Sequence, residues 1–370
     1  MNKDRIERAY DPKLDSIRII ACLAVVLLHV SARPIYMQKE LSQWGWMLGN
    51  AVSSLTHWCV PVFVMLSGAL VLADKRTTYP YMLVHRVPRM LVVLAISSII
   101  YALWMFFFQH AFEWKAFTRD LLMGMPYCHL HFFYLIIGLY IIVPSISQAV
   151  IAMDEKHVRN AAVVACLISA VTFFWSVWTR AYSPNGGSFS WGYWLFYSLI
   201  LYPSIKAQSA LCNYLPGWLR GYVVTWLRGY VVTWLRGYVV TVVGAGLLSY
   251  KTADGSVWKL YLYTYFSPTV VAMSIGTWGL GVKVAKYVRV SWLKTLAPLA
   301  LLVYILHPIF MEIIRAKYKI ISPALMRPEI EVPLTFILTT LGAFSGLRFE
   351  KNPNREDIFL NPIYGSGIFF

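Results

Sequence analysis

The stretch Arg18-Ile-Ile-Ala-Cys-Leu-Ala-Val-Val-Leu-Leu-His29 separates an arginine from a histidine by ten uncharged residues. Both polar side chains are costly to bury in an apolar setting, so their spacing needs an explanation. If the stretch is a helix, eleven steps of about 100° bring the two side chains to within about 20° of the same face, about 16 Å apart along the axis. One face of the helix then carries a polar group at each end.

The rest of the chain indicates that this apolar setting is a membrane. Of the 370 residues, 58% are hydrophobic and only 14% are charged, and the mean hydropathy is +0.58. This balance lies outside the range of soluble domains. The sequence therefore predicts an all-α fold, a polytopic transmembrane bundle of about ten helices. The expected spans are 14–32, 53–73, 90–108, 130–150, 160–178, 190–204, 229–249, 258–280, 292–311 and 330–346.

The net charge of +16 describes topology in such a protein and does not indicate a nucleic-acid partner. With the N-terminus in the cytoplasm, the cytoplasmic segments before the tail hold sixteen Lys and Arg residues and the opposite loops hold ten, with a cluster at 315–327 as the main exception. This count favours a cytoplasmic N-terminus. We expect one membrane domain over 1–346 and a polar cytoplasmic tail over 347–370. The five cysteines lack metal-ligand spacing, so no metal is expected.

His29 is the first candidate for a functional residue. An ionisable side chain at this depth in a span normally faces the bundle interior or a watery cavity, which favours function over a satisfied core histidine. Arg18, taken alone, is typical of an interfacial anchor that reaches toward the headgroups. Its position on the same face as His29 suggests a shared role.

Five stretches occur together in a characteristic order. They are Asp15-Ser-Ile-Arg18 with His29, Pro61–Gly68, Arg86-Val-Pro-Arg89, Tyr127–Tyr134 and Tyr304-Ile-Leu-His307-Pro308. Together they resemble membrane acyltransferase family 3, whose members O-acylate bacterial surface glycans with an acyl donor from the cytoplasm. The likeness is greatest to the enterobacterial common antigen type of O-acetyltransferase. Two features depart from the pattern: His131 stands where a tryptophan is usual, and the glycine expected in the sixth helix is missing from 197–202.

The resemblance implies an acyltransferase of the bacterial inner (cytoplasmic) membrane, with acetyl-CoA as acyl donor and a surface glycan or lipid-linked sugar as acceptor. The thioester comes from inside and the hydroxyl from outside, and both must meet at a base. A polar helix face from Arg18 to His29 suits that task. We expect His29 to be the general base, or to form an acyl-histidine. The resemblance places Arg18, Arg86 and Arg89 on the coenzyme A phosphates and His129, Tyr304 and His307 at the acceptor.

Simpler roles remain open for several of these residues. Arg86 and Arg89 also fit a cytoplasmic anchor, and His129 fits an interfacial position. His307 fits packing as well as function. Two carboxylates, Glu113 and Glu312, could orient a histidine, although we expect both to be solvated.

Transport is the alternative function. Intramembrane histidines also carry protons and substrate in transporters, so the chain could be a transporter or flippase of a glycan or small metabolite. Transporters of this kind are often built from two similar halves, and no such repeat is visible in the sequence. This favours the acyltransferase.

An octapeptide, Trp-Leu-Arg-Gly-Tyr-Val-Val-Thr, occurs three times without change over 218–241. Eight residues advance a helix by about 80° beyond two turns, so the repeats form no stripe and have no clear structural purpose. At the nucleotide level, three copies of TGGTTACG encode the octapeptide, and nine encode the whole tract. Gain or loss of one unit would shift the reading frame. The sequence therefore predicts a phase-variable gene, although an ordinary duplication of coding sequence is the alternative.

Overall fold

The computed structural model describes residues 12–37, 40–72, 76–154, 220–251, 262–284, 296–322 and 326–346, with position 74 and scattered positions between 156 and 171. Within this part of the chain every regular element is a helix. Five helical stretches there are long and apolar enough to cross a membrane: Leu14–Tyr36, Gln43–Leu72, Tyr79–Gln109, His131–Ala149 and Tyr230–Leu247. They correspond to five of the expected spans, which confirms an all-helical membrane fold.

The total of ten spans and the cytoplasmic N-terminus stay predictions. The expected span 190–204 and the tail 347–370 lie outside the described residues, as does most of 160–178.

The N-terminal half of the described chain holds α1 (Pro12–Tyr36), α2 (Gln43–Thr56), α3 (Cys59–Leu72), α4 (Tyr79–Tyr81), α5 (Val87–Trp104), α6 (Trp114–Leu122) and α7 (His131–Ala152). Two short π-helices flank α5: η1 (Met82–Arg86) precedes it and η2 (Met105–Gln109) follows it. The C-terminal half holds α11 (Arg220–Lys251), α13 (Pro268–Val284), the 3₁₀ turn η5 (Ala297–Leu299), α15 (Ala300–Ile321) and α16 (Pro328–Gly346).

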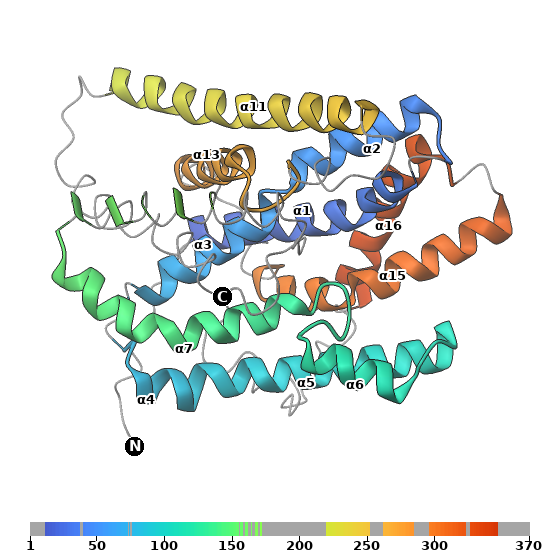
Figure 1. Ribbon diagram of the computed structural model, residues 1–370, viewed down its shortest axis with the longest axis horizontal. Coiled ribbons are helices and arrows are strands. Elements are labelled where there is room, and N and C mark those ends of the chain that lie inside the picture. Colours follow the sequence, from blue (N-terminus) through green and yellow to red (C-terminus); the bar gives the residue numbers. More distant parts are fainter. Residues whose placement is uncertain are drawn as a thin grey trace.

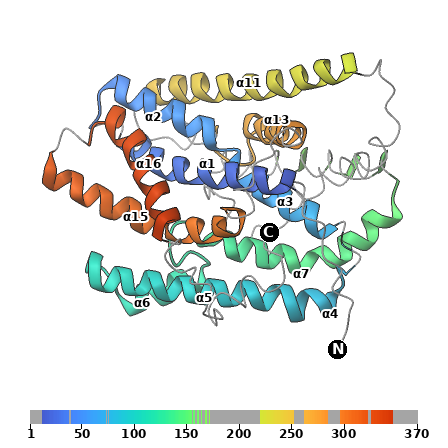
Figure 2. The same cartoon turned by 180° about the vertical axis from the view of Figure 1, so that it is seen from behind.

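Helix α1 lies in the middle of the bundle. Figure 1 shows α11 along one edge and α5 along the opposite edge, with α1, α7 and α15 between them, and Figure 2 shows the same order from behind. Helices α2, α3, α13, α15 and α16 all contact α1. Its side chains Cys22, Val26 and Val30 are fully buried. Polar groups on the buried face of α1 are therefore placed within the protein, whereas Ile20, on another face, is exposed.

Three expected spans have different boundaries, each for a local reason. The span 53–73 falls across two helices, and side chains at the break act as helix caps: His57 Nδ1 donates to the Ser53 carbonyl and Trp58 Nε1 to the Leu55 carbonyl, both at 2.6 Å. The span 258–280 becomes α13, which begins only at Pro268, a residue suited to a helix start. The span 292–311 becomes α15, which continues to Ile321.

The repeat tract forms the first two-thirds of α11, from Arg220 onward. Its last copy packs antiparallel against α13. A Cβ atom on Gly237 would lie 2.6 Å from the Thr269 carbonyl oxygen, and one on Gly276 would lie 3.0 Å from the Trp234 Cβ. Because the two backbones approach so closely, the glycine of this copy is required by packing.

Candidate functional site

Helix α1 carries both ends of the polar face predicted from the spacing. Arg18 and His29 lie on one unbroken helix. Arg18 donates to Asp15, one turn earlier, at 2.5 Å, and the two side chains are only 14% and 15% exposed. His29 is half-buried. The arginine and the histidine therefore lie at two different heights along the axis of α1. We call these heights the arginine level and the histidine level of the bundle.

Three histidines that are far apart in sequence meet at the level of His29. The ring centroid of His29 lies 5.0 Å from that of His307 on α15 and 6.3 Å from that of His129, which precedes α7. The His129 and His307 centroids are 5.4 Å apart. His129 and His307 have no exposed surface, whereas His29 keeps some. In this histidine cluster, His29 is the member best placed to meet a substrate.

A proline fixes the hydrogen bonding of His307. Pro308 lies inside α15 and has no N–H, so it leaves the carbonyl of Tyr304, four residues earlier, without its helical donor. His307 Nδ1 donates to that carbonyl at 2.8 Å and also reaches the Val303 carbonyl at 3.1 Å. The Nε2 atom of a neutral His307 is then an acceptor. It is buried and finds no hydrogen-bond partner among the described residues.

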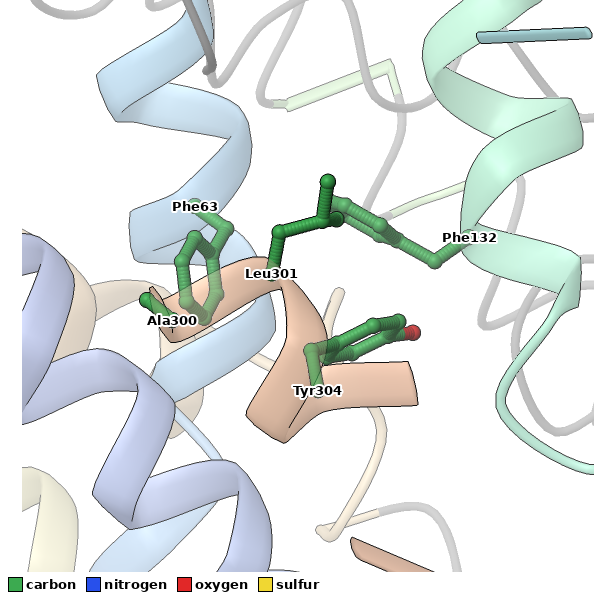
Figure 3. A pocket seen from close by; sticks show the side chains of 5 residues that line it. All are labelled: Phe63, Phe132, Ala300, Leu301 and Tyr304. Carbon is green, nitrogen blue, oxygen red and sulfur yellow. The ribbon is translucent and has the colours of Figure 1, made fainter. Parts of the chain in front are cut away.

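Tyr304 connects α15 with the segment that holds His129. Its hydroxyl donates to the main-chain carbonyl of His129 at 2.6 Å. The Tyr304 ring also borders a small apolar pocket between α3, α7 and α15 (Figure 3). In the figure, Phe63 and Phe132 line this pocket together with Leu301, and Tyr304 lies beside them. Tyr304 thus separates an apolar pocket from the histidine cluster.

Two of the three predicted arginines, Arg18 and Arg86, lie near the same tyrosine of α7. Arg86 lies in η1 and is only 4% exposed, with its guanidinium carbon 6.0 Å from the ring centroid of Tyr140 on α7. Tyr140 is also within electrostatic range of Arg18. The Arg86 Nε atom is buried and has no hydrogen-bond partner among the described residues. Arg89, at the start of α5, is half-buried. Arg18 and Arg86 therefore approach a common neighbour.

The two carboxylates considered in the sequence behave differently. Glu113 is exposed, as expected. Glu312 was expected to be solvated, and this is wrong: it is half-buried and accepts hydrogen bonds from Trp104, Gln109 and Tyr127. Its position near the end of an apolar span indicated exposure, but donors from α5, from η2 and from the loop before α7 cover it.

A third carboxylate, Glu331, was not singled out in the sequence. It has no exposed surface, and it accepts from Arg33 and, at 2.6 Å, from Arg315 Nε. Arg315 also donates to the Val30 carbonyl at 2.9 Å. That carbonyl lies four residues before Pro34 and so lacks its helical donor. This ionic group ties α1, α15 and α16 together directly beside His29.

His131, which replaces the usual tryptophan, starts α7. Its Nδ1 donates to the Cys128 carbonyl at 2.9 Å, and its ring is buried. His57, at the break between α2 and α3, lies with His131 within electrostatic range of His29. Sequence periodicity could not reveal His57, because its proximity to His29 depends on how α2 and α3 fold back on α1. No group of three or more His, Cys, Asp or Glu side chains in the described ranges is arranged to hold a metal ion.

The family comparison decides the class of protein. A family model described as "Acyltransferase domain" matches residues 11–348, nearly the whole chain. The chain belongs to acyltransferase family 3. The family predicted from the motifs is thereby confirmed, and with it a membrane acyltransferase. No curated protein and no solved structure matches this acyltransferase.

Proposed function

We propose that this acyltransferase moves an acyl group, specifically acetyl, from cytoplasmic acyl-CoA to a hydroxyl of a surface polysaccharide or its lipid-linked sugar precursor. The likeness to the enterobacterial common antigen O-acetyltransferase supports this choice of acceptor. The enzyme would act in the bacterial inner membrane. The observation that carries the proposal is the position of His29: it is the partly accessible member of a buried histidine cluster, on the same helix as an arginine about 16 Å away.

His29 acts as the general base in this proposal. Its imidazole takes the proton from the acceptor hydroxyl while the hydroxyl oxygen bonds to the acyl carbon. The C–S bond then breaks, and the coenzyme A thiolate leaves and takes up the proton from His29. In a second route a ring nitrogen of His29 bonds to the acyl carbon, the C–S bond breaks and the coenzyme A thiolate leaves. The acceptor hydroxyl then takes the acyl group from His29, and its proton passes to the thiolate. In both routes the Nε2 acceptor of His307, with its ring centroid 5.0 Å from that of His29, can receive the other ring N–H of His29 and so orient the base.

The donor would be held at the arginine level. Arg18 and Arg86, and Arg89 at the start of α5, supply guanidinium groups that pair well with phosphate. The unpartnered and buried Nε of Arg86 fits an anionic ligand. The distance to His29 matches an extended pantetheine arm. The small apolar pocket beside Tyr304 favours a short acyl chain, and His129, Tyr304 and His307 would contact the acceptor.

The gene would also be phase-variable. The tract is accounted for by nine copies of one octanucleotide, and a change of one copy interrupts the reading frame. Sequencing the tract from many colonies of one strain should give mixed copy numbers. A fixed number in all colonies would rule this out.

The central test is the O-acetyl content of surface polysaccharide, measured by proton NMR. A deletion strain is complemented with the wild type, with His29→Ala or with His85→Ala at matched protein levels; His85 is an exposed histidine and serves as the control. We expect wild type and His85→Ala to restore the acetyl signals and His29→Ala to lower them by at least about 100-fold. Unchanged acetylation in the deletion strain, with reduced polysaccharide export, would instead point to transport.

A further inference from the structure

Glu312 lies at the centre of a hydrogen-bond network beside the histidine cluster. Its Oε2 atom accepts from Trp104 Nε1 at 2.8 Å and from Gln109 Nε2 at 2.7 Å. Its Oε1 atom accepts from the hydroxyl of Tyr127. Gln109 also donates to the Tyr127 hydroxyl at 3.1 Å. One carboxylate on α15 thus accepts from three donors, which lie at the end of α5, in η2 and in the loop before α7.

The local backbone brings two of these donors together. Trp104 is the last residue of α5, and Gln109 is the last residue of η2, five positions later. Residues five apart lie on different sides of an α-helix. In a π-helix their backbone groups are hydrogen-bonded to each other, so their side chains are neighbours. The segment then ends at His110, which has a positive φ of 51°. The π-helix therefore aims both side chains at Glu312.

Tyr127 connects the carboxylate to the histidine cluster. Its ring stacks on that of Tyr101 with centroids 4.1 Å apart, and both rings meet His129 edge to face, at 5.9 Å and 5.1 Å. Burial, and then the hydrogen bond to Glu312, raise the pKa of the Tyr127 phenol, so it remains a donor. The Tyr101 hydroxyl is held by the Ile305 carbonyl at 2.6 Å. The His129 ring is consequently packed against two tyrosines, and Glu312 holds one of them, Tyr127, by a hydrogen bond.

We propose that Glu312 is a positioning residue: it holds Tyr127 against Tyr101 and so fixes the ring of His129 for the acceptor. This inference rests on the proposed function, in which His129 contacts the acceptor. Glu312 acts through Tyr127 and need not touch the reacting atoms. Loss of its carboxylate should therefore impair use of the acceptor. The donor site should be unaffected, because Arg18 lies about 16 Å from His29 along α1.

Gln109, which donates to Glu312, allows a test in which the two side chains are exchanged. In the single variant Glu312→Gln, the amides at positions 109 and 312 face each other and Tyr127 loses its carboxylate acceptor. In a double variant that combines Gln109→Glu with Glu312→Gln, the carboxylate and the amide change places. The carboxylate now at position 109 can accept from Tyr127 and from the amide nitrogen at position 312, and the amide oxygen at position 312 can accept from Trp104. The donors of the network then regain acceptors.

The experiment measures transfer from radiolabelled acetyl-CoA in membrane vesicles, with unacetylated polysaccharide from the deletion strain as acceptor. We expect Glu312→Gln to lower kcat/KM for the polysaccharide about tenfold and to leave KM for acetyl-CoA within about twofold. The double variant should recover at least half of the loss, and Glu113→Gln, at an exposed carboxylate, should behave as wild type. A merely structural role would lower the amount of active enzyme, and therefore kcat/KM for acetyl-CoA and for the polysaccharide by the same factor.

Two results would overturn the proposal. In the first, wild-type vesicles transfer acetyl, but Glu312→Gln leaves kcat/KM for the polysaccharide unchanged, whether or not KM for acetyl-CoA changes. The positioning role then fails and the proposed function stands. If wild-type vesicles transfer no acetyl to the polysaccharide, the proposed function fails and the role of Glu312 falls with it.

Discussion

Insertion of one more octapeptide into α11 should leave the enzyme active. Three additional octanucleotides lengthen the tract by eight residues and keep the reading frame. The insertion displaces the N-terminal end of α11 by about 12 Å and rotates it by about 80° relative to the rest of that helix. However, the copies are identical, so the residues that face α13 do not change. Tyr230, Trp234 and Gly237 would each be replaced by the same residue type at the same distance from the helix end.

A substitution within the last copy should have the opposite effect. A Cβ at Gly237 would lie 2.6 Å from the Thr269 carbonyl oxygen and 2.8 Å from Met273 Cγ. Gly237→Leu should therefore force α11 and α13 apart and cost about 1–3 kcal/mol or more. The insertion carries no such cost, because it creates no new contact with α13.

The assay compares protein level in isolated membranes with O-acetyl content of surface polysaccharide. We expect the octapeptide insertion to keep at least half of the wild-type protein level and O-acetyl content. Gly237→Leu should lower both quantities strongly. A single extra octanucleotide shifts the reading frame and should abolish both the protein and the acetylation. If the in-frame insertion removes the protein or its activity, the first copies have a fixed structural role and the identical copies are not interchangeable.

Three further variants probe the site. Pro308→Ala restores a helical N–H for the Tyr304 carbonyl, which competes with His307 Nδ1; transfer should fall several-fold while the melting temperature rises, measured on purified enzyme in detergent. Arg86→Lys removes the planar fork that pairs with phosphate, so KM for acetyl-CoA should rise about tenfold with KM for the acceptor unchanged. Leu301→Ala enlarges the apolar pocket, so transfer from propionyl-CoA relative to acetyl-CoA should rise about tenfold in a competition assay.

The sequence was most informative where function depends on spacing along one helix. Ten uncharged residues between Arg18 and His29 are enough to place both on one face, because helical geometry is local. Local motifs were also enough for the family. The meeting of His29 with His129 and His307 follows from how α1, α15 and the segment before α7 come together, and no pattern within a single segment encodes such contacts.

Carboxylates were harder to predict than histidines. A glutamate near the end of an apolar span looks solvated when only its own neighbours in sequence are considered. Glu312 is covered because a π-helix, which periodicity does not reveal, turns Gln109 toward it. Arg315 was counted among the positive residues that depart from the charge rule, yet it is paired with the fully buried Glu331. The Arg315 charge is neutralised by an ion pair within the protein, so its position says little about which side of the membrane the loop lies on.

Two prolines connect these observations. A proline inside a helix leaves the carbonyl four residues earlier without a donor, which normally destabilises the helix. Pro34 leaves the Val30 carbonyl without a helical donor, and Arg315 donates to it instead. Pro308 does the same to the Tyr304 carbonyl, and His307 donates to it. Both carbonyls lie within one turn of a histidine of the cluster. The stability lost at each proline is therefore offset by a hydrogen bond from a functional or neighbouring side chain, and this bond defines how that side chain is held. Replacing either proline should relax the site without unfolding the helix.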